Sequence, residues 1–145
     1  MLINIRRLFL ALAMCCSVAC LAIAQSNESS WPRIVGGNVG VDCSYCESAK
    51  ADFDLIAQVA NEKQSNVIVI ARLGKGELRK INHVRLRQLR EWLLQVRGYA
   101  PERIVTAEGE RMHGLGQVEV YISGRPIFIY RMRRNKDFFR GCDCP

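Results

Sequence analysis

Apolar side chains recur at helical spacing in two long segments of this chain, residues 46–63 and 77–97. The face predicted for the first segment consists of Ala49, Phe53, Ile56, Ala57 and Ala60. The stripe predicted for the second consists of Leu78, Ile81, Leu86, Leu89, Leu93 and Val96. Gly98 and Pro101 follow the second stripe, as is typical after the end of a helix. The pattern therefore predicts two amphipathic helices.

Shorter apolar segments predict strands around these helices. Residues 67–71 form a continuous apolar run, which suits a strand covered on both faces. Residues 117–122 alternate between apolar and polar side chains, which predicts a strand with one solvated face. Further strands are expected at 103–107, at 127–132 and, near the start, within 33–41. The predicted order is β-α-β-α-β-β with an extra strand. We interpret it as a two-layer α/β sandwich of the α+β class, with two helices packed on one sheet.

The first 24 residues resemble a secretory signal peptide. Arg6 and Arg7 precede an apolar stretch at 8–23, and Ala22-Ile23-Ala24 is a small-x-small cleavage site. The stretch is shorter than the roughly 20 residues that span a membrane, so cleavage before Gln25 is preferred to an uncleaved anchor. We expect a periplasmic, outer-membrane-associated or secreted protein. Membrane attachment is expected only if this segment stays uncleaved.

The predicted domain boundaries follow from these segments. Residues 1–24 are the signal peptide, and residues 25–42 are a lead with the first strand. Residues 43–124 form the α/β domain. Residues 125–145 hold the extra strand and a basic tail that contains cysteine.

Four of the seven cysteines lie outside the predicted signal peptide, in two close pairs. These are Cys43 with Cys46 and Cys142 with Cys144. An even number of cysteines in an exported chain predicts disulfide bonds, with three connectivities open. Pairing between the two clusters is preferred, because closing a loop of about 100 residues stabilises by about 4.7 kcal/mol in the chain-entropy model. A structural zinc site and a redox-active pair at a helix start are the alternatives, and no metal is expected.

The chain carries a formal net charge of +7, with the excess in residues 72–97 and 131–140. A basic face attracts nucleic acid, anionic lipid or an acidic glycan, although a solvated helix face also explains it. Export argues against nucleic acid. A solvated helix face with a basic tail is the preferred explanation of the charge, and an acidic component of the cell envelope is the partner class expected if the face binds.

No pattern of catalytic side chains stands out. His83 and His113 are the two histidines, and neither lies in a metal-ligand spacing. The glycines at 109, 114 and 116 lack the Lys-Ser/Thr that follows a phosphate-binding loop. We therefore predict a noncatalytic protein without cofactors. The alternative is a periplasmic thiol-disulfide oxidoreductase that uses Cys43-x-x-Cys46, since Gly124-Arg125-Pro126-Ile127 resembles the thioredoxin-like strand that a proline precedes.

One run of motifs gives a family resemblance. Arg85-Leu86-x-x-Leu89-x-x-Trp92-Leu93 is followed by Gly98, Pro101 and Arg103-Ile104, and Glu119 lies in a later Val-Glu-Val strand. In order and spacing, residues 53–122 resemble the OmpA-like family. The resemblance implies a domain that holds the peptide stem of peptidoglycan without covalent chemistry.

In that family an Asp after the second strand and an Arg on the second helix bind the charged ends of a diamino acid. Arg85 falls on the Arg position, so it is the candidate peptidoglycan-binding residue. The Asp is absent, because this chain has Ala71-Arg72-Leu73-Gly74 at that turn. Arg72 is expected to add a second cation near Arg85. The predicted function is an exported, noncatalytic envelope protein that binds peptidoglycan or another envelope component.

Overall fold

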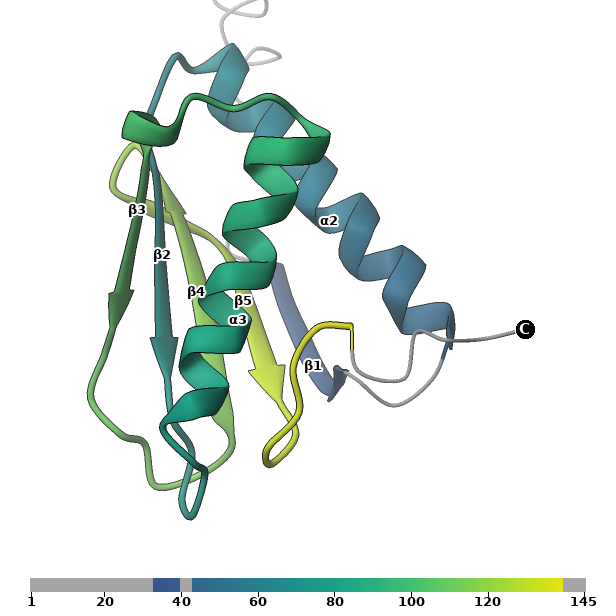
Figure 1. The fold of residues 1–145 in the computed structure, drawn as a ribbon, viewed down its shortest axis with the longest axis vertical. Coiled ribbons are helices and arrows are strands. Elements are labelled where there is room, and N and C mark those ends of the chain that lie inside the picture. Colours follow the sequence, from purple (N-terminus) through teal and green to yellow (C-terminus); the bar gives the residue numbers. More distant parts are fainter. Residues whose placement is uncertain (1–32, 40–42, 140–145) are drawn as a thin grey trace, which may run out of the picture. The chain divides into compact units, whose positions relative to one another are not determined.

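A computed structural model describes residues 33–39 and 43–139 of the chain, with side chains from residue 46 to residue 139. The strands of this part are β1 (Arg33–Val39), β2 (Val67–Arg72), β3 (Ile104–Glu108), β4 (Gly116–Ile122) and β5 (Arg125–Met132). The helices are α2 (Cys43–Glu62) and α3 (Lys80–Glu91), and α3 continues as a π-helical segment, Trp92–Val96. Figure 1 shows the helices packed against the sheet, so the predicted α+β fold is confirmed.

The strands form one mixed sheet in the order β1-β5-β4-β2-β3. β2 and β3 are parallel neighbours joined through α3, while β4 is antiparallel to both β2 and β5. β4 and β5 form a hairpin around Ser123 and Gly124, whose φ angles of 53° and 74° suit the turn that matches strand twist. β1 is parallel to β5. The strand predicted at 127–132 is therefore present, and it lies inside the sheet.

Helix α2 presents the predicted apolar face to the core. Its five predicted core positions are all buried, with Phe53 fully so. The helix begins three residues earlier than the apolar pattern indicated, at Cys43. Helical periodicity was a sufficient signal here because, from residue 46 onward, every buried position of the helix is apolar or small, apart from Asp52.

The prediction for the second helix was wrong at both ends. The regular helix begins at Lys80, so Leu78 lies in the preceding turn and is 54% exposed. The wider π-helical turn of Trp92–Val96 changes the helical phase, and Val96 is 51% exposed. The four central stripe positions, from Ile81 to Leu93, are buried as predicted. Gly98 ends the segment with a positive φ of 60°, a conformation that glycine adopts readily.

The prediction that the strand at 67–71 is covered on both faces was also wrong. Its residues alternate between buried and half-buried, and Val67, Val69 and Ala71 belong to the core that the helices cover. Ile68 and Ile70 lie on the opposite face and remain half-buried. The strand is thus covered by helices on one face and not on both. A continuous apolar run could not separate these cases, because isoleucine is tolerated on either face.

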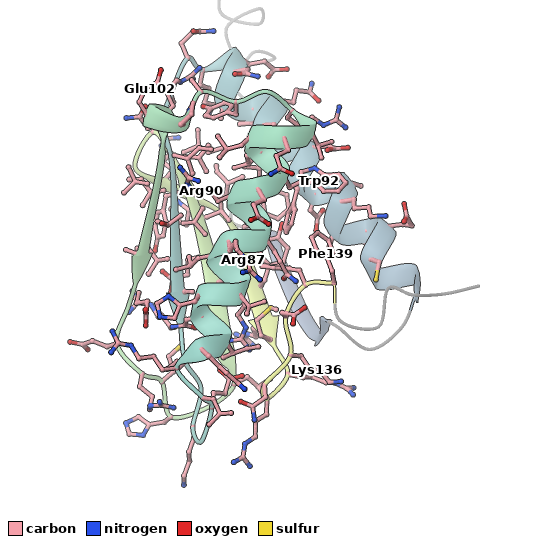
Figure 2. All side chains as sticks on the ribbon, viewed as in Figure 1. Arg87, Arg90, Trp92, Glu102, Lys136 and Phe139 are labelled. Carbon is pink, nitrogen blue, oxygen red and sulfur yellow. The ribbon has the colours of Figure 1, made fainter. Side chains whose placement is uncertain are left out.

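An aromatic cluster joins the two layers. The ring of Phe53 on α2 makes edge-to-face contacts with Tyr130 of β5 at 6.1 Å and with Phe138 at 4.9 Å between centroids. It also contacts Trp92 at 6.4 Å, and Trp92 lies 6.1 Å from Phe139 (Figure 2). These contacts anchor the segment after β5 on the helical layer.

Candidate functional site

Three loops meet at one end of the sheet. β2, β3 and β5 end there and β4 begins there, because Arg72 pairs with Gln117 and Gly116 pairs with Met132 in the ladder. The loops that follow or precede these strand ends are residues 73–79, 109–115 and 133–137, and we call them together the loop end (Figure 1). Helix α3 starts from the first of these loops, and Arg85 lies on its second turn.

Arg85 forms a buried ion pair with Glu77. The guanidinium donates from Nη2 to Oε1 at 2.7 Å and from Nη1 to Oε2 at 3.0 Å, so the pair is bidentate. The two side chains are 0% and 1% exposed. A bidentate pair fixes both groups in direction as well as distance. The candidate ligand-binding arginine is therefore already bound to a carboxylate of its own chain.

Backbone groups complete this centre. Arg85 Nε donates to the carbonyl of Lys136 at 2.8 Å, and the Glu77 carboxylate accepts from the backbone N–H of Gly74 and of Asn135 at 2.7 and 2.9 Å. The ion pair thus joins the loop before α3, the helix itself and the chain after β5. Burial alone would raise the pKa of Glu77, but the hydrogen bonds from Arg85 and from Gly74 outweigh it. The pKa of Glu77 is consequently below its ordinary 4.5.

Glycines allow the loops to approach closely. A Cβ on Gly74 would lie 2.4 Å from the backbone nitrogen of Gly116, and one on Gly116 would lie 2.2 Å from Glu77 Oε2. The N–H of Lys75 donates to the carbonyl of Gly114 at 3.0 Å. Gly74 and Gly116 therefore mark a site of close packing around the ion pair. The Gly-rich spacing was the sequence signal for this contact.

A second polar cluster lies on the other face of the sheet. Arg72 Nε donates to Glu119 Oε1 at 2.7 Å, and Gln117 and Tyr121 donate to the same carboxylate at 2.8 and 2.7 Å. Burial would raise the pKa of Glu119, yet these donors, led by Arg72, bring it below the ordinary value. Arg72 follows Ala71, which faces the helices, so it points to the opposite face from Arg85. The expectation that the two arginines lie together was wrong.

The predicted disulfide cysteines are only partly described. Cys46 is 5% exposed and disulfide-bonded, and its partner lies outside the side chains that the structure describes. Cys43 begins α2, while Cys142 and Cys144 lie outside the described residues. The pairing between the two clusters stays a prediction. The predicted signal peptide and most of the 25–42 lead also lie outside the described residues.

The register of β1 and β5 bears on the thioredoxin-like alternative. Arg33 pairs with Phe128 and Val39 pairs with Met132, so the chain that leads into α2 leaves the sheet where β5 ends. Pro126 lies at the beginning of β5, opposite Tyr121. The proline and the first turn of α2 therefore lie at opposite ends of the sheet.

Both histidines lie at the surface of the described part of the chain. His83 is 65% exposed, with Nε2 3.3 Å from Glu108 Oε1, and His113 is exposed in its loop. Among the side chains that the structure describes, those of residues 46–139, no three from His, Cys, Asp or Glu gather as a metal site would require. None of the described helices is long and apolar enough to span a membrane.

Comparison with known proteins does not assign the chain to a family. No protein-family model, no curated protein and no solved structure matches the chain. The fold and the site define an α+β domain whose loop end is organised by a buried Arg85–Glu77 pair.

Proposed function

We propose that this chain is an exported, noncatalytic domain of the cell envelope with an OmpA-like fold. We further propose that its ligand is peptidoglycan. The observation that carries the proposal is the bidentate guanidinium–carboxylate pair of Arg85 at the loop end. The family resemblance implies a pair of this kind between the helix arginine and a carboxylate of the peptide stem. In this chain Glu77 supplies the carboxylate.

The connection from α3 to β3 supports the same proposal. Gly98 has a positive φ, Pro101 opens a 3-10 turn, and Arg103 donates to the carbonyls of Ala60 and Ser65 at 3.2 and 2.8 Å. Tyr99 adds a hydrogen bond to the same Ser65 carbonyl. The arginine that the family pattern places before the third strand thus ties the start of β3 to the end of α2. These residues stabilise the connection between α3 and β3, which is a structural role that motif residues commonly have.

A ligand carboxylate can pair with Arg85 only if it replaces the carboxylate of Glu77. A stem-peptide carboxylate that reached the guanidinium would have to displace a carboxylate from the same chain, which is held by Gly74 and Asn135. The chain around Lys136 would also have to move, because it covers the arginine. Removing the charge of Glu77 is therefore expected to favour an external carboxylate at this position.

Co-sedimentation with purified, lipid-free sacculi tests this function. We expect the wild-type protein to bind, Glu77→Gln to bind more tightly, and Arg85→Ala to lose binding. Thermal unfolding of each variant checks that the domain is folded at the temperature of the assay. Arg87→Ala is the matched control, since Arg87 lies on the same helix but its side chain is 66% exposed.

Two outcomes would contradict the proposal. Failure of the wild type and of Glu77→Gln to bind sacculi would remove peptidoglycan as the ligand. Binding that survives in a folded Arg85→Ala protein would show that the loop-end arginine does not recognise it.

A further inference from the structure

The loop end carries a dense group of cations. The exposed or half-exposed basic side chains there are Lys75, Arg79, Arg111, Arg133, Arg134 and Lys136, and Lys80 follows as the first residue of α3. Lys136 extends outward from the segment after β5 in Figure 2. Acidic groups offset part of this charge: Glu77 is paired with Arg85, and Glu108 lies 3.6 Å from Arg79. Glu110 and Asp137 also belong to these loops, but the cations outnumber the acidic side chains. The surface therefore has a positive potential over three neighbouring loops.

Two large apolar side chains are exposed among these cations. Leu78 is 54% exposed in the first loop and Leu115 is 47% exposed in the second. The backbone hydrogen bond from Lys75 to Gly114 joins the two loops that carry these leucines, so both residues lie at the loop end. Of the other large apolar residues exposed in the described chain, Val96 lies at the far end of the helix and Val105 on the edge strand β3.

Hydrogen bonds hold the first loop in place. Arg111 donates to the carbonyls of Gly74 and Glu77 at 2.7 and 3.1 Å. Arg134 donates to the carbonyl of Gly76 at 3.2 Å, and the N–H of Leu78 donates to the Asn135 side chain at 3.1 Å. Leu78 is thus exposed on a loop whose backbone is held by three residues of the other two loops, Arg111, Arg134 and Asn135.

The cations and the two exposed leucines together favour one kind of partner. Cations alone would suit any polyanion, but a solvated phosphate chain offers leucine no apolar contact. The loop end contains no Phe, Tyr or Trp on which a nucleic-acid base could stack. An anionic bilayer satisfies both features, because phosphates attract the cations while the acyl boundary accepts the leucines.

We propose that the loop end docks on the surface of a membrane that contains anionic phospholipids. Leu78 and Leu115 enter the headgroup region, and the surrounding lysines and arginines pair with lipid phosphates. The sequence predicts membrane contact only through an uncleaved signal segment, so this surface is an additional one. The proposal does not depend on peptidoglycan binding, since sacculi contain no lipid and vesicles contain no peptidoglycan.

Vesicle flotation with the chain as isolated from cells tests the docking. Vesicles of phosphatidylcholine alone are compared with equimolar phosphatidylcholine and phosphatidylglycerol. We expect binding to the anionic vesicles that is at least about tenfold tighter, since each juxtaposed cation contributes about fivefold. Any apolar segment that remains at the N-terminus contributes equally to every variant and appears as binding to the neutral vesicles.

Two double variants separate the apolar and charged contributions. Leu78→Ser with Leu115→Ser is expected to weaken binding to anionic vesicles about tenfold or more, because two leucines lose their apolar contact. Lys75→Glu with Lys80→Glu is expected to reduce it at least as much. Val96→Ser and Lys63→Glu are the matched controls, because both residues are exposed at the opposite end of the sheet. Thermal unfolding confirms that each variant is folded.

Each alternative outcome overturns the proposal. Equal binding to neutral and anionic vesicles would remove the charge requirement. Loss in the lysine variant but not in the leucine variant would identify a general polyanion surface, especially if soluble heparin or duplex DNA competes equally well. Loss in the control variants to the same extent would show that the effect does not belong to the loop end.

Discussion

Replacing Arg85 by Met is expected to lower the free energy of unfolding by about 3–5 kcal/mol, because it leaves the Glu77 carboxylate buried and unpaired. Glu77 is 1% exposed, and three groups besides Arg85 Nη2 are arranged around its oxygens. Urea denaturation followed by circular dichroism measures the change. Arg87→Met is the control, and its cost is expected to stay within about 0.5 kcal/mol because that side chain is exposed.

The double variant Arg85→Met with Glu77→Gln tests whether the two charges act as a unit. Its destabilisation is expected to be smaller than the sum of the single variants, by about 2–3 kcal/mol. The glutamine oxygen can still accept one backbone N–H, so the double variant retains part of the centre. Additive single effects, or a cost of Arg85→Met below about 1 kcal/mol, would contradict a buried pair.

The same pair gives the domain a pH-dependent stability. The folded-state pKa of Glu77 is below its ordinary 4.5, so its contribution is fully present above pH 4.5. That contribution is lost as the pH falls through the folded-state pKa. In Glu77→Gln the fall in stability below pH 4.5 is therefore expected to be shallower than in the wild type. Some fall remains, because the pKa values of Glu119, paired with Arg72, and of Asp54, paired with Arg97, are also lowered.

Truncating Phe53 to Ala is expected to cost about 3–5 kcal/mol, the range for deleting a buried aromatic ring from a core. The ring is fully buried and contacts four other aromatic rings, two of which belong to the segment after β5. Its loss should also loosen Phe138 and Phe139 from the helical layer. Faster hydrogen exchange at residues 136–139 would report that loosening.

Phe53→Leu is the matched control for this truncation. It keeps most of the apolar volume and is expected to cost less than about 1.5 kcal/mol. A similar cost for Leu and Ala would mean that the ring contacts, and not the filled volume, stabilise the site. A cost below about 1 kcal/mol for Phe53→Ala would contradict the position of the ring in the core.

The regular parts of the fold could be predicted from the sequence because each has a simple period. Phe53, Ile56 and Ala60 recur along α2, and Val118, Val120 and Ile122 alternate along β4, so the buried face follows from spacing alone. The errors arose where the period changes. Leu78 precedes the helix, and Val96 lies in a wider turn, so a stripe of constant period assigned both to the core.

The candidate site could be predicted only in part. An arginine at position 85 is visible in the sequence, and the OmpA-like spacing draws attention to it. Its partner was missed because Glu77 lies in the loop before the helix, eight residues earlier. Helical periodicity does not predict which side chains are close together in such a loop. The covering carbonyl of Lys136 is 51 residues away and belongs to a segment that the pattern assigned to a tail. Burial of a charged group depends on such distant contacts, and a local pattern does not contain them.

The loop-end surface shows a similar limit. Charge excess in residues 72–97 and 131–140 was apparent, but the sequence placed these runs on a helix face and a tail. The strand order brings both runs to the same end of the sheet, and the close approach at Gly74 adds the loop that contains Leu115. Sheet topology therefore converts separate basic segments into one surface.

The central claim is that this domain works outside the cytoplasm, and a nonreducing peptide map of the protein isolated from an envelope fraction tests it most directly. The account predicts a chain that begins at Gln25, in which Cys43 and Cys46 are disulfide-linked to Cys142 and Cys144. A chain recovered from the cytoplasm with its apolar N-terminus intact and its cysteines all present as thiols would contradict it.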